Sequence, residues 1–487
     1  MTSAADAPPR TPPSQPLPPG VIRGFKWSFA ATALQGILQI VVTMTMARML
    51  IPAEYGLYAM VDTVLRWASL MAQMGLTTVL VQRQHLSEVE LRAAHTLALT
   101  LSVLAALITA LGAPIAAAWF GAREIVPLLQ VAALSFIISG LGLTSLAMLR
   151  RRMQFGRLGA AEIAGYVIGN GATSIYLATR GAGVWSIVIG TLVGQSVQTL
   201  VALVQAKLPF GFSFRFATLR TFFRDGAHVS VNTFLDIANN TMDTVVIARV
   251  MPTNVVGLFN RSAMLATLPT IFLWTAVSRV AFPSYARLQH APREFSQLLR
   301  RVQAWSGPVC VAVPLGMIPA ADVIVHFLLG ENWAGAVPIV RLLLLGVAFD
   351  SLAFPYHNAL DALGCYMERT KIRLIIFALR ATALGVFATF RADWLFAVAS
   401  IAAASTWVIS IRPVARQLQG PIAPFFVADL KILLRALICF IAVAAARFCG
   451  HLLGMDPPLI LLTCIISGAV ALGLVLRPYW PGRKLAS

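Results

Sequence analysis

Charged residues are scarce in this sequence: Asp, Glu, Lys and Arg make up 12% of its 487 residues, whereas hydrophobic residues make up 58%. A soluble domain carries about 25% charged and 45–50% apolar residues. The mean hydropathy is +0.78, so a chain of this length has too much apolar surface to bury in one water-soluble fold. The composition excludes a soluble protein and predicts one that crosses a membrane several times.

Alternation of apolar and polar residues with period two is also missing, which excludes a membrane β-barrel. The apolar runs are continuous, and each approaches the roughly 20 residues that a helix needs to cross a bilayer core. The predicted fold class is an all-α polytopic membrane protein with about fourteen transmembrane helices. The expected helices span residues 27–50, 54–82, 93–119, 124–149, 158–179, 183–206, 226–251, 255–282, 302–328, 334–362, 372–390, 393–411, 431–449 and 457–476.

The sequence lacks the motifs of common catalytic sites. It contains no HExxH metal-binding motif, no nucleophile elbow and no Walker loop, and its expected outer loops are too short for a catalytic domain. The cysteines have no metal-ligand spacing and fall within or beside expected helices: Cys310, Cys365, Cys439, Cys449 and Cys464. We therefore predict a protein that is not an enzyme, with no metal site and no cofactor.

Acidic residues are the minority among the charges. The chain has 38 Lys and Arg residues against 19 Asp and Glu, a net charge of +19. Most basic residues fall in the tail and in every second loop, as the positive-inside rule predicts for the cytoplasmic side. This distribution predicts that both termini are cytoplasmic, and it explains the charge without nucleic acid as a partner. The opposite loops hold Arg48, Arg123, Arg180, Arg249, Arg391 and Arg447.

One helix–turn–helix stretch occurs twice. "ARMLIPAEYGLYAM" at 47–60 returns without a gap as "ARVMPTNVVGLFNR" at 248–261, so Gly56 matches Gly257. The first copy joins expected helices 1 and 2, and the second joins helices 7 and 8. The chain is therefore predicted to contain two six-helix units in the same orientation. Parallel repeats of this kind are typical of transporters, with the substrate path between the repeats and alternating access by rocking.

The predicted organisation follows from this repeat. A disordered, proline-rich cytoplasmic tail is expected at 1–23, with no cleavable signal peptide. An N-lobe of six helices occupies 24–210, and a C-lobe of six helices occupies 211–415. Two further helices and a short cytoplasmic tail are expected at 416–487.

Several stretches carry a resemblance to a known family. "ARMLIPAEYGLYAM", followed by "MGLTTVLVQR", resembles the opening of the polysaccharide transporter branch of the MOP (multidrug/oligosaccharidyl-lipid/polysaccharide) exporter superfamily. Later stretches match the same branch in order: "LRRRMQFGRLGAAEIAGYVIG", "GAGVWSIVIG", "MDTVVIARVMPTNVVGLFNRSAMLATLP" and "SRVAFPSYARLQ". The resemblance covers about residues 24–290 well, and the remainder mainly by topology.

This resemblance implies a flippase of the bacterial inner membrane. Such a protein moves an undecaprenyl-diphosphate-linked oligosaccharide from the cytoplasmic to the periplasmic leaflet, for O-antigen, capsule or exopolysaccharide assembly. The family implies a monomer that contacts membrane lipids, with a polysaccharide polymerase and chain-length or export proteins as candidate partners. Three alternatives stay open: a cation-coupled multidrug antiporter of the same superfamily, a flippase for the peptidoglycan lipid precursor, and a non-transporting scaffold of a glycan-assembly complex.

A flipped diphosphate needs basic side chains inside the bundle, because guanidinium groups bind phosphate through paired hydrogen bonds. Arg66 and Asp62 lie four residues apart in the expected helix 54–82, and Arg261 lies in the first two turns of the helix at 255–282. Arg66 and Arg261 are the predicted diphosphate contacts, with Asp62 beside them. The competing interpretations are a structural ion pair between Arg66 and Asp62, and an Arg261 side chain that reaches the outer interface.

The expected helix at 226–251 carries a polar stripe. Asp236, Asn239, Asn240 and Asp243 follow the spacing i, i+3, i+4, i+7 and so share one helix face. We predict that this face lines the sugar path or binds a coupling cation. Hydrogen bonding between helices of one lobe is the alternative.

The expected helix at 334–362 carries three titratable residues on one face, Asp350, His357 and Asp361, with Pro355 among them. A proline there would kink the helix and free backbone carbonyl groups. These residues are candidates for a relay that couples transport to H⁺ or Na⁺. The simpler interpretation places Asp361 at the cytoplasmic interface, and nothing in the sequence requires coupling.

Overall fold

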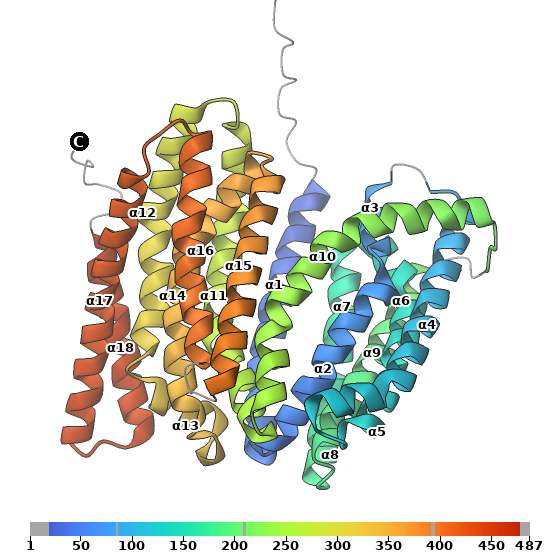
Figure 1. Ribbon diagram of the computed structural model, residues 1–487, viewed down its shortest axis with the longest axis horizontal. Helices are drawn as coiled ribbons and strands as arrows, with labels where there is room; N and C mark the ends of the chain where they lie inside the picture. Colours follow the sequence, from blue (N-terminus) through green and yellow to red (C-terminus); the bar gives the residue numbers. More distant parts are fainter. Residues whose placement is uncertain (1–18, 84–85, 208–210, 391–394, 478–487) are drawn as a thin grey trace, which may run out of the picture.

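The structure is a computed structural model that describes residues 19–83, 86–207, 211–390 and 395–477. Every element in these ranges is helical, and none is a strand. In Figure 1 the long helices run side by side and the chain turns back at both ends of the bundle. The predicted all-α polytopic fold class is confirmed.

The bounds of the helices are as follows. The first part of the chain forms α1 (Pro19–Met49), α2 (Pro52–Gln73), α3 (Leu76–Gln82), α4 (Glu88–Phe120), α5 (Ile125–Ala132), α6 (Leu134–Arg151), α7 (Phe155–Gly165), the π-helix η1 (Tyr166–Thr173), α8 (Ser174–Thr179) and α9 (Val184–Ala206). The second part forms α10 (Phe216–Val250), α11 (Thr253–Arg287), α12 (Pro292–Met317), α13 (Ala321–Leu329), the 3₁₀-helix η2 (Glu331–Trp333), α14 (Ala336–Ala362), α15 (Tyr366–Phe390), α16 (Leu395–Gln417), α17 (Ala423–Leu452) and α18 (Pro457–Leu476).

Each expected helix falls on helical structure, but some are broken. The helix predicted at 54–82 is the pair α2 and α3, which bend by 43°, and the helix predicted at 302–328 is the pair α12 and α13, which bend by 77°. The first bend lies at Met74 and Gly75, with φ angles of 36° and 63°. Glycine adopts positive φ without a steric penalty, so Gly75 permits the break.

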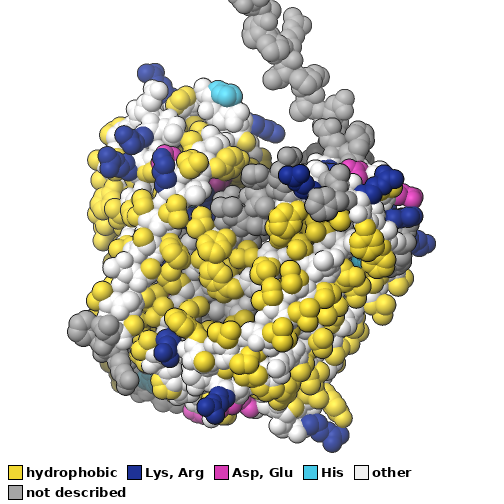
Figure 2. Space-filling model, turned by 45° about the vertical axis from the view of Figure 1, so that its right-hand side comes forward, with side chains coloured by type: hydrophobic (Ala, Val, Ile, Leu, Met, Phe, Trp, Pro, Cys, Tyr) yellow, Lys and Arg dark blue, Asp and Glu magenta, His cyan; other side chains and the backbone are white. Residues whose placement is uncertain are grey.

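The number of membrane crossings stays a prediction. Eight helices of the described chain are long and apolar enough to cross a membrane, or ten when each bent pair counts as one span. Helices α10 and α15 are not among them, and both carry charges along their length, including Asp236, Asp243, Arg373 and Arg380. Figure 2 shows hydrophobic side chains over the middle of the visible face, with basic side chains mainly toward its two ends. The chain is a multi-pass membrane protein.

Two groups of helices lie apart in Figure 1. Helices α2–α9 form the right-hand group and α11–α18 the left-hand group; α1 lies between them, and α10 begins over the right-hand group and then descends between the two. This order agrees with the succession of the predicted N-lobe and C-lobe, whose boundaries stay predictions. Below, these names refer to the two groups of helices.

The two copies of the repeated stretch meet where α2 and α11 begin. A Cβ atom on Gly56 would overlap the carbonyl oxygen of Thr253, and a Cβ atom on Gly257 would overlap the carbonyl oxygen of Pro52. The contact is reciprocal, because each helix start packs on the other's glycine. Only residues without a side chain allow such a close approach of two backbones. We call this contact the glycine junction; it lies at the predicted outer end of the bundle.

Further contacts surround the glycine junction. The indole Nε1 of the fully buried Trp333 donates a hydrogen bond of 2.8 Å to the carbonyl oxygen of Ala47. The Tyr55 ring meets the Trp333 ring edge-on, with centroids 5.4 Å apart. Arg48 donates a hydrogen bond of 2.8 Å to the carbonyl oxygen of Phe327. These bonds join α1 and α2 to the segment around α13, so the two groups of helices are held together at this end.

The glycine junction predicts a large effect of one methyl group. Gly257→Ala should lower the stability of the purified protein by about 1–3 kcal/mol, because the two helix starts must separate to make room. The measurement is the midpoint of thermal unfolding in detergent. Gly112→Ala is the matched control: its Cβ meets nothing within 4 Å on α4, so it should be neutral or stabilising. Equal midpoints for both variants would contradict the close contact.

Candidate functional site

Arg261 lies on α11, about one helical turn beyond Gly257. Its guanidinium carbon lies 4.0 Å from the centroid of the Tyr55 ring on α2, so the side chain bridges the two groups of helices. One terminal nitrogen lies 3.3 Å from the sulfur of Met264. The Nε atom is buried without a hydrogen-bond partner, and no carboxylate pairs with Arg261 in the described residues. The guanidinium charge is therefore available for an anion.

The N-lobe contains a polar cavity of about 330 Å³, lined by residues of α2, α4, α6 and α9 among others. We call it the N-lobe cavity. Both Asp62 and Arg66 line it. Arg66 Nε donates to Asp62 Oδ2 at 2.7 Å, which is the ion pair that the sequence offered as the alternative role for Arg66. Since 60% of the Arg66 side chain is exposed, pairing does not remove it from the cavity.

A second cavity, of about 290 Å³, lies in the C-lobe and is called here the C-lobe cavity. Three residues of the predicted stripe line it: Asn239, Asn240 and Asp243 of α10. Arg380 of α15 forms an ion pair with Asp243 and donates a hydrogen bond of 3.3 Å to the carbonyl oxygen of Asn239. Asp350 of α14 lines the same cavity, without a hydrogen bond or ion pair to any described residue.

Asp236, the fourth member of the stripe, does not line the C-lobe cavity. Its Oδ1 lies 2.9 Å from Arg373 of α15, and half of the Asp236 side chain is exposed. The four stripe residues therefore have different surroundings. Asp236 and Asp243 join α10 to α15 through ion pairs with arginines, and Asn239 and Asn240 line the cavity. The alternative, polar contacts between helices, therefore applies to Asp236 and Asp243, and a sugar path or cation site along this face stays a prediction.

The three candidate relay residues do not form a relay in this structure. His357 Nε2 lies 3.0 Å from Ser410 Oγ on α16, and Asp361 forms an ion pair with Arg369. No bond joins Asp350, His357 and Asp361 to one another within the described residues. At a rise of 1.5 Å per residue, Asp350 and His357 lie about 10 Å apart along α14, which is too far for a hydrogen bond. Sharing a face did not bring them together.

A buried carboxylate on α17 was missed by the sequence analysis. Asp429 is fully buried and accepts hydrogen bonds from Gln303 of α12, from Tyr356 of α14 at 2.6 Å and from Trp407 of α16 at 2.8 Å. It joins the first of the two C-terminal helices to the C-lobe. The expected helix began at residue 431, whereas α17 begins at Ala423, so Asp429 was assigned to a loop.

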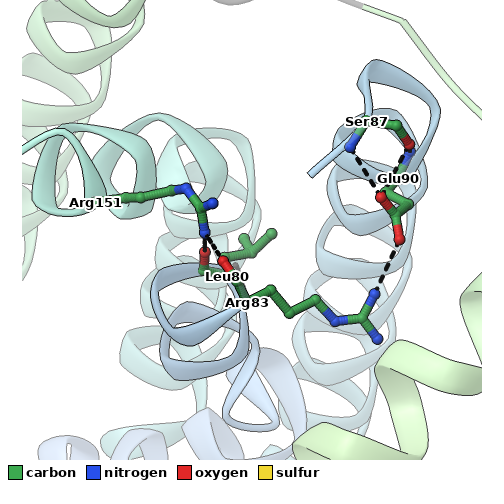
Figure 3. A network of polar contacts seen from close by, with 5 residues as sticks. All are labelled: Leu80, Arg83, Ser87, Glu90 and Arg151. Carbon is green, nitrogen blue, oxygen red and sulfur yellow. Dashed lines mark hydrogen bonds and ion pairs between the residues drawn. The ribbon is translucent and has the colours of Figure 1, made fainter. Parts of the chain in front are cut away.

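The arginines at the predicted cytoplasmic end of the N-lobe bind backbone carbonyl groups. Arg151 donates to the carbonyl oxygens of Leu80, at 3.0 Å, and Arg83, so it caps the end of α3 (Figure 3). Arg83 in turn pairs with Glu90 at 3.1 Å, and Glu90 closes a capping box with Ser87 at the start of α4. Capping therefore accounts for these charges without a ligand.

The ion pair in the C-lobe cavity predicts that the stability of the protein depends strongly on both Asp243 and Arg380. Arg380→Ala should destabilise the protein by about 3 kcal/mol, because Asp243, only 13% exposed, would keep an unpaired buried charge. The double variant Asp243→Asn/Arg380→Gln should recover most of the midpoint of thermal unfolding. Arg373→Ala, in the more exposed pair on the same two helices, is the control and should change little. Equal losses for Arg380→Ala and Arg373→Ala would disprove the assignment.

The chain matches a family model and known proteins. The model of the polysaccharide biosynthesis protein family matches residues 45–338. Lipopolysaccharide biosynthesis protein WzxC of Escherichia coli (strain K12) is 23% identical over 70% of each chain. Teichuronic acid biosynthesis protein TuaB of Bacillus subtilis (strain 168) is 24% identical over 71% of each. Succinoglycan biosynthesis transport protein ExoT of Rhizobium meliloti (strain 1021) is 26% identical over 67% of this chain and 66% of its own.

Solved structures show the same fold. The lipid II flippase MurJ in an inward closed conformation has a TM-score of 0.75 at 13% identity, covering 92% of this chain and 98% of its own. An inward-facing multidrug resistance transporter of the MATE family in the MOP superfamily has a TM-score of 0.59 at 15% identity, covering 79% and 96%. The family match extends over more than half of the chain and confirms the resemblance found in the sequence. The chain belongs to the polysaccharide biosynthesis protein family.

Proposed function

We propose that this protein is a flippase for a lipid-linked oligosaccharide. It moves an undecaprenyl-diphosphate-linked repeat unit from the cytoplasmic to the periplasmic leaflet of the bacterial inner membrane, by alternating access between the two lobes. The product supplies the assembly of a surface polysaccharide. Relatives named for lipopolysaccharide, teichuronic acid and succinoglycan biosynthesis support a polysaccharide precursor as the cargo.

Arg261 is the observation on which the proposal rests most. Other arginines within the bundle are neutralised by carboxylates: Arg66 by Asp62, Arg369 by Asp361, Arg373 by Asp236, Arg380 by Asp243 and Arg447 by Asp322. Arg261 has no such partner among the described residues, and it lies where the two lobes meet. A charge inside a membrane protein is costly, so a cation kept unpaired there is suited to an anionic cargo such as a diphosphate.

The charge of the cavities argues against the multidrug antiporter. Among the residues that line the N-lobe cavity, Asp62 is the carboxylate and Arg66 and Arg150 are the cations. With Asp62 already paired to Arg66, the cavity has no free negative charge for a cationic drug. A neutral or anionic head group fits this lining better.

The glycine junction supports alternating access. It holds the lobes together at the predicted outer end through Gly56 and Gly257, so access in this conformation is from the cytoplasmic side. Rocking of one lobe on the other would separate the junction and release the cargo outward. Since both lobes lie in one chain, a monomer is sufficient. A polymerase and chain-length or export proteins would then receive the flipped unit.

We propose further that transport is coupled to H⁺ or Na⁺ and that Asp350 binds the coupling ion. Asp350 lies in the C-lobe cavity beside the Asp243–Arg380 pair and forms no ion pair with a described residue. The three groups together carry one net negative charge when ionised, which one H⁺ or Na⁺ would neutralise. Binding there would change the attraction between α10, α14 and α15.

The first test of the function is genetic. In a host that lacks its own copy, Arg261→Ala should reduce surface polysaccharide roughly tenfold or more, with accumulation of the undecaprenyl-diphosphate-linked oligosaccharide, because a lost charged contact costs about 1.5–3 kcal/mol. Arg261→Lys should retain part of the activity. Both pools are measured by mass spectrometry and normalised to the membrane level of the protein. Arg123→Ala, at an exposed loop arginine, is the control.

Two other outcomes would contradict the flippase function. Unchanged pools of both polymers in the Arg261→Ala strain, with a higher sensitivity to cationic drugs, would favour the antiporter. Loss of surface polysaccharide without accumulation of the lipid-linked unit would place the defect before the flipping step and would favour a scaffold.

Coupling is tested with reconstituted protein. If Asp350 binds the coupling ion, Asp350→Asn should abolish the stimulation of flipping by an imposed pH or Na⁺ gradient, because the amide cannot change its charge. The measurement is the initial rate in proteoliposomes with each gradient separately. Asp456→Asn, in the exposed loop before α18, should leave the stimulation intact. Full stimulation of the Asp350→Asn variant would exclude Asp350 as the coupling residue.

A further inference from the structure

The N-lobe cavity is lined by amide and hydroxyl side chains from several helices. Gln195 and Gln198 project from successive turns of α9, and Ser135 and Ser139 from α6. Residues of α2 and α4 add to the polar lining, which includes Ser69, Thr77, Thr191 and Thr199. It also includes a group of six side chains: Gln73, Ser102, Ser135, Ser139, Gln195 and Gln198. The cavity volume of about 330 Å³ falls in the usual range for small-molecule pockets, about 300–1,000 Å³.

The six amide and hydroxyl side chains listed above form no hydrogen bond with a described residue. Gln195 Oε1 is buried and unpaired, and none of the other five donates or accepts a bond through its side chain. Two other polar side chains of the lining do find partners: Thr199 donates to the carbonyl oxygen of Ile138 at 3.2 Å, and Thr191 to that of Ile187 at 2.8 Å. An unpaired buried polar group is costly, so Gln195 Oε1 is placed to accept a hydrogen bond from water or from a polar ligand in the cavity.

The chemistry of the lining selects among possible ligands. Amides and hydroxyls both donate and accept hydrogen bonds, so they suit a molecule that carries many hydroxyl groups. Asp62 is neutralised by Arg66 at 2.7 Å, and Arg150, the other charged residue of the lining, lies 3.8 Å from Glu162. The cavity therefore disfavours cations and suits uncharged or weakly anionic hydroxylated groups.

The cavity is also near the unpaired guanidinium. Tyr58 lines the cavity, and it lies about one turn of α2 from Tyr55, whose ring lies 4.0 Å from the guanidinium carbon of Arg261. One end of a ligand in the cavity can therefore lie close to the interface between the lobes, where Arg261 sits against Tyr55.

We propose that the N-lobe cavity is a sugar subsite, in which the amide side chains of Gln195 and Gln198 and the neighbouring serines bind hydroxyl groups of the oligosaccharide while Arg261 binds the diphosphate. This inference rests on the proposed flippase function and adds the part of the protein that recognises the sugar. It assigns recognition of the sugar to the N-lobe cavity. The side chains of α6 and α9 that line this cavity would then determine which sugar binds.

Binding of two lipids separates this inference from the proposed function. The probes are undecaprenyl diphosphate and undecaprenyl-diphosphate-linked oligosaccharide purified from the host, and the readout is the dissociation constant of the purified protein in nanodiscs. Gln195→Leu/Gln198→Leu should weaken binding of the sugar-bearing lipid roughly tenfold or more, because each lost hydrogen bond accounts for a few-fold to tenfold. Binding of undecaprenyl diphosphate should not change.

Two further variants keep the result interpretable. Gln130→Leu, at an exposed position of α5, is the matched control and should bind both lipids as the wild type does. Ser135→Ala/Ser139→Ala makes a smaller change in the same cavity and should weaken only the sugar-bearing lipid, by a smaller factor, so misfolding of one variant does not decide the outcome.

Each result supports or excludes the sugar subsite or the diphosphate site. If the glutamine variant binds both lipids as the wild type does, or loses both equally, the cavity is not a sugar subsite and holds only water or supports the fold. If Arg261→Ala leaves both affinities unchanged, the diphosphate site of the proposed function fails, whatever the glutamine variant shows. Selective loss of the sugar-bearing lipid in the glutamine and serine variants supports the subsite.

Discussion

The close approach of α2 and α11 at their first turns determines much of the remaining structure. Gly56 and Gly257 each lack the side chain that would collide with the carbonyl group of the opposite helix start. Two backbones in contact fix the spacing and the crossing of the two helices, and these helices bear Arg66 and Arg261. The aromatic pair Tyr55 and Trp333 packs beside the contact, and the same Tyr55 ring supports the guanidinium of Arg261. One steric constraint thus closes the bundle at one end and positions the unpaired cation just inside it.

Charge pairing divides the interior into regions with different chemistry. Arginines that meet a carboxylate, such as Arg380 with Asp243 or Arg447 with Asp322, join helices that are distant in the sequence. Such pairs satisfy charges that lipid could not solvate. Arg261 and Asp350 remain without an ion-pair partner in the described residues, the first at the interface between the lobes and the second in the C-lobe cavity. The lobes are therefore not equivalent, although they share a repeated sequence: the N-lobe cavity is lined by several amide and hydroxyl side chains, and the C-lobe cavity contains a carboxyl group without an ion-pair partner in the described residues.

Prediction from the sequence succeeded where the signal was repeated along the chain. Continuous apolar runs predicted helices at the right places, and the duplicated motif predicted two units; the contact between its two copies was found in the structure. Pairs on a single helix were also within reach, since Asp62 and Arg66 lie four residues apart and form the expected contact. The three candidate relay residues on α14 share a face, but that face does not record their partners: His357 contacts Ser410 of α16, Asp361 pairs with Arg369 of α15, and Asp350 lies seven residues from His357 in the C-lobe cavity.

By itself, the sequence determined the all-α membrane fold, the duplication and the family, because apolar content, helix length and motif order are properties of neighbouring residues. Only the tertiary structure decided which charges are neutralised. Arg373 and Arg380 meet Asp236 and Asp243 through the packing of α15 on α10, Asp429 is enclosed by residues of α12, α14 and α16, and Gln195 faces a cavity instead of a partner. Such contacts depend on how helices distant in the chain rotate and approach one another, and the periodicity within one helix does not record that information.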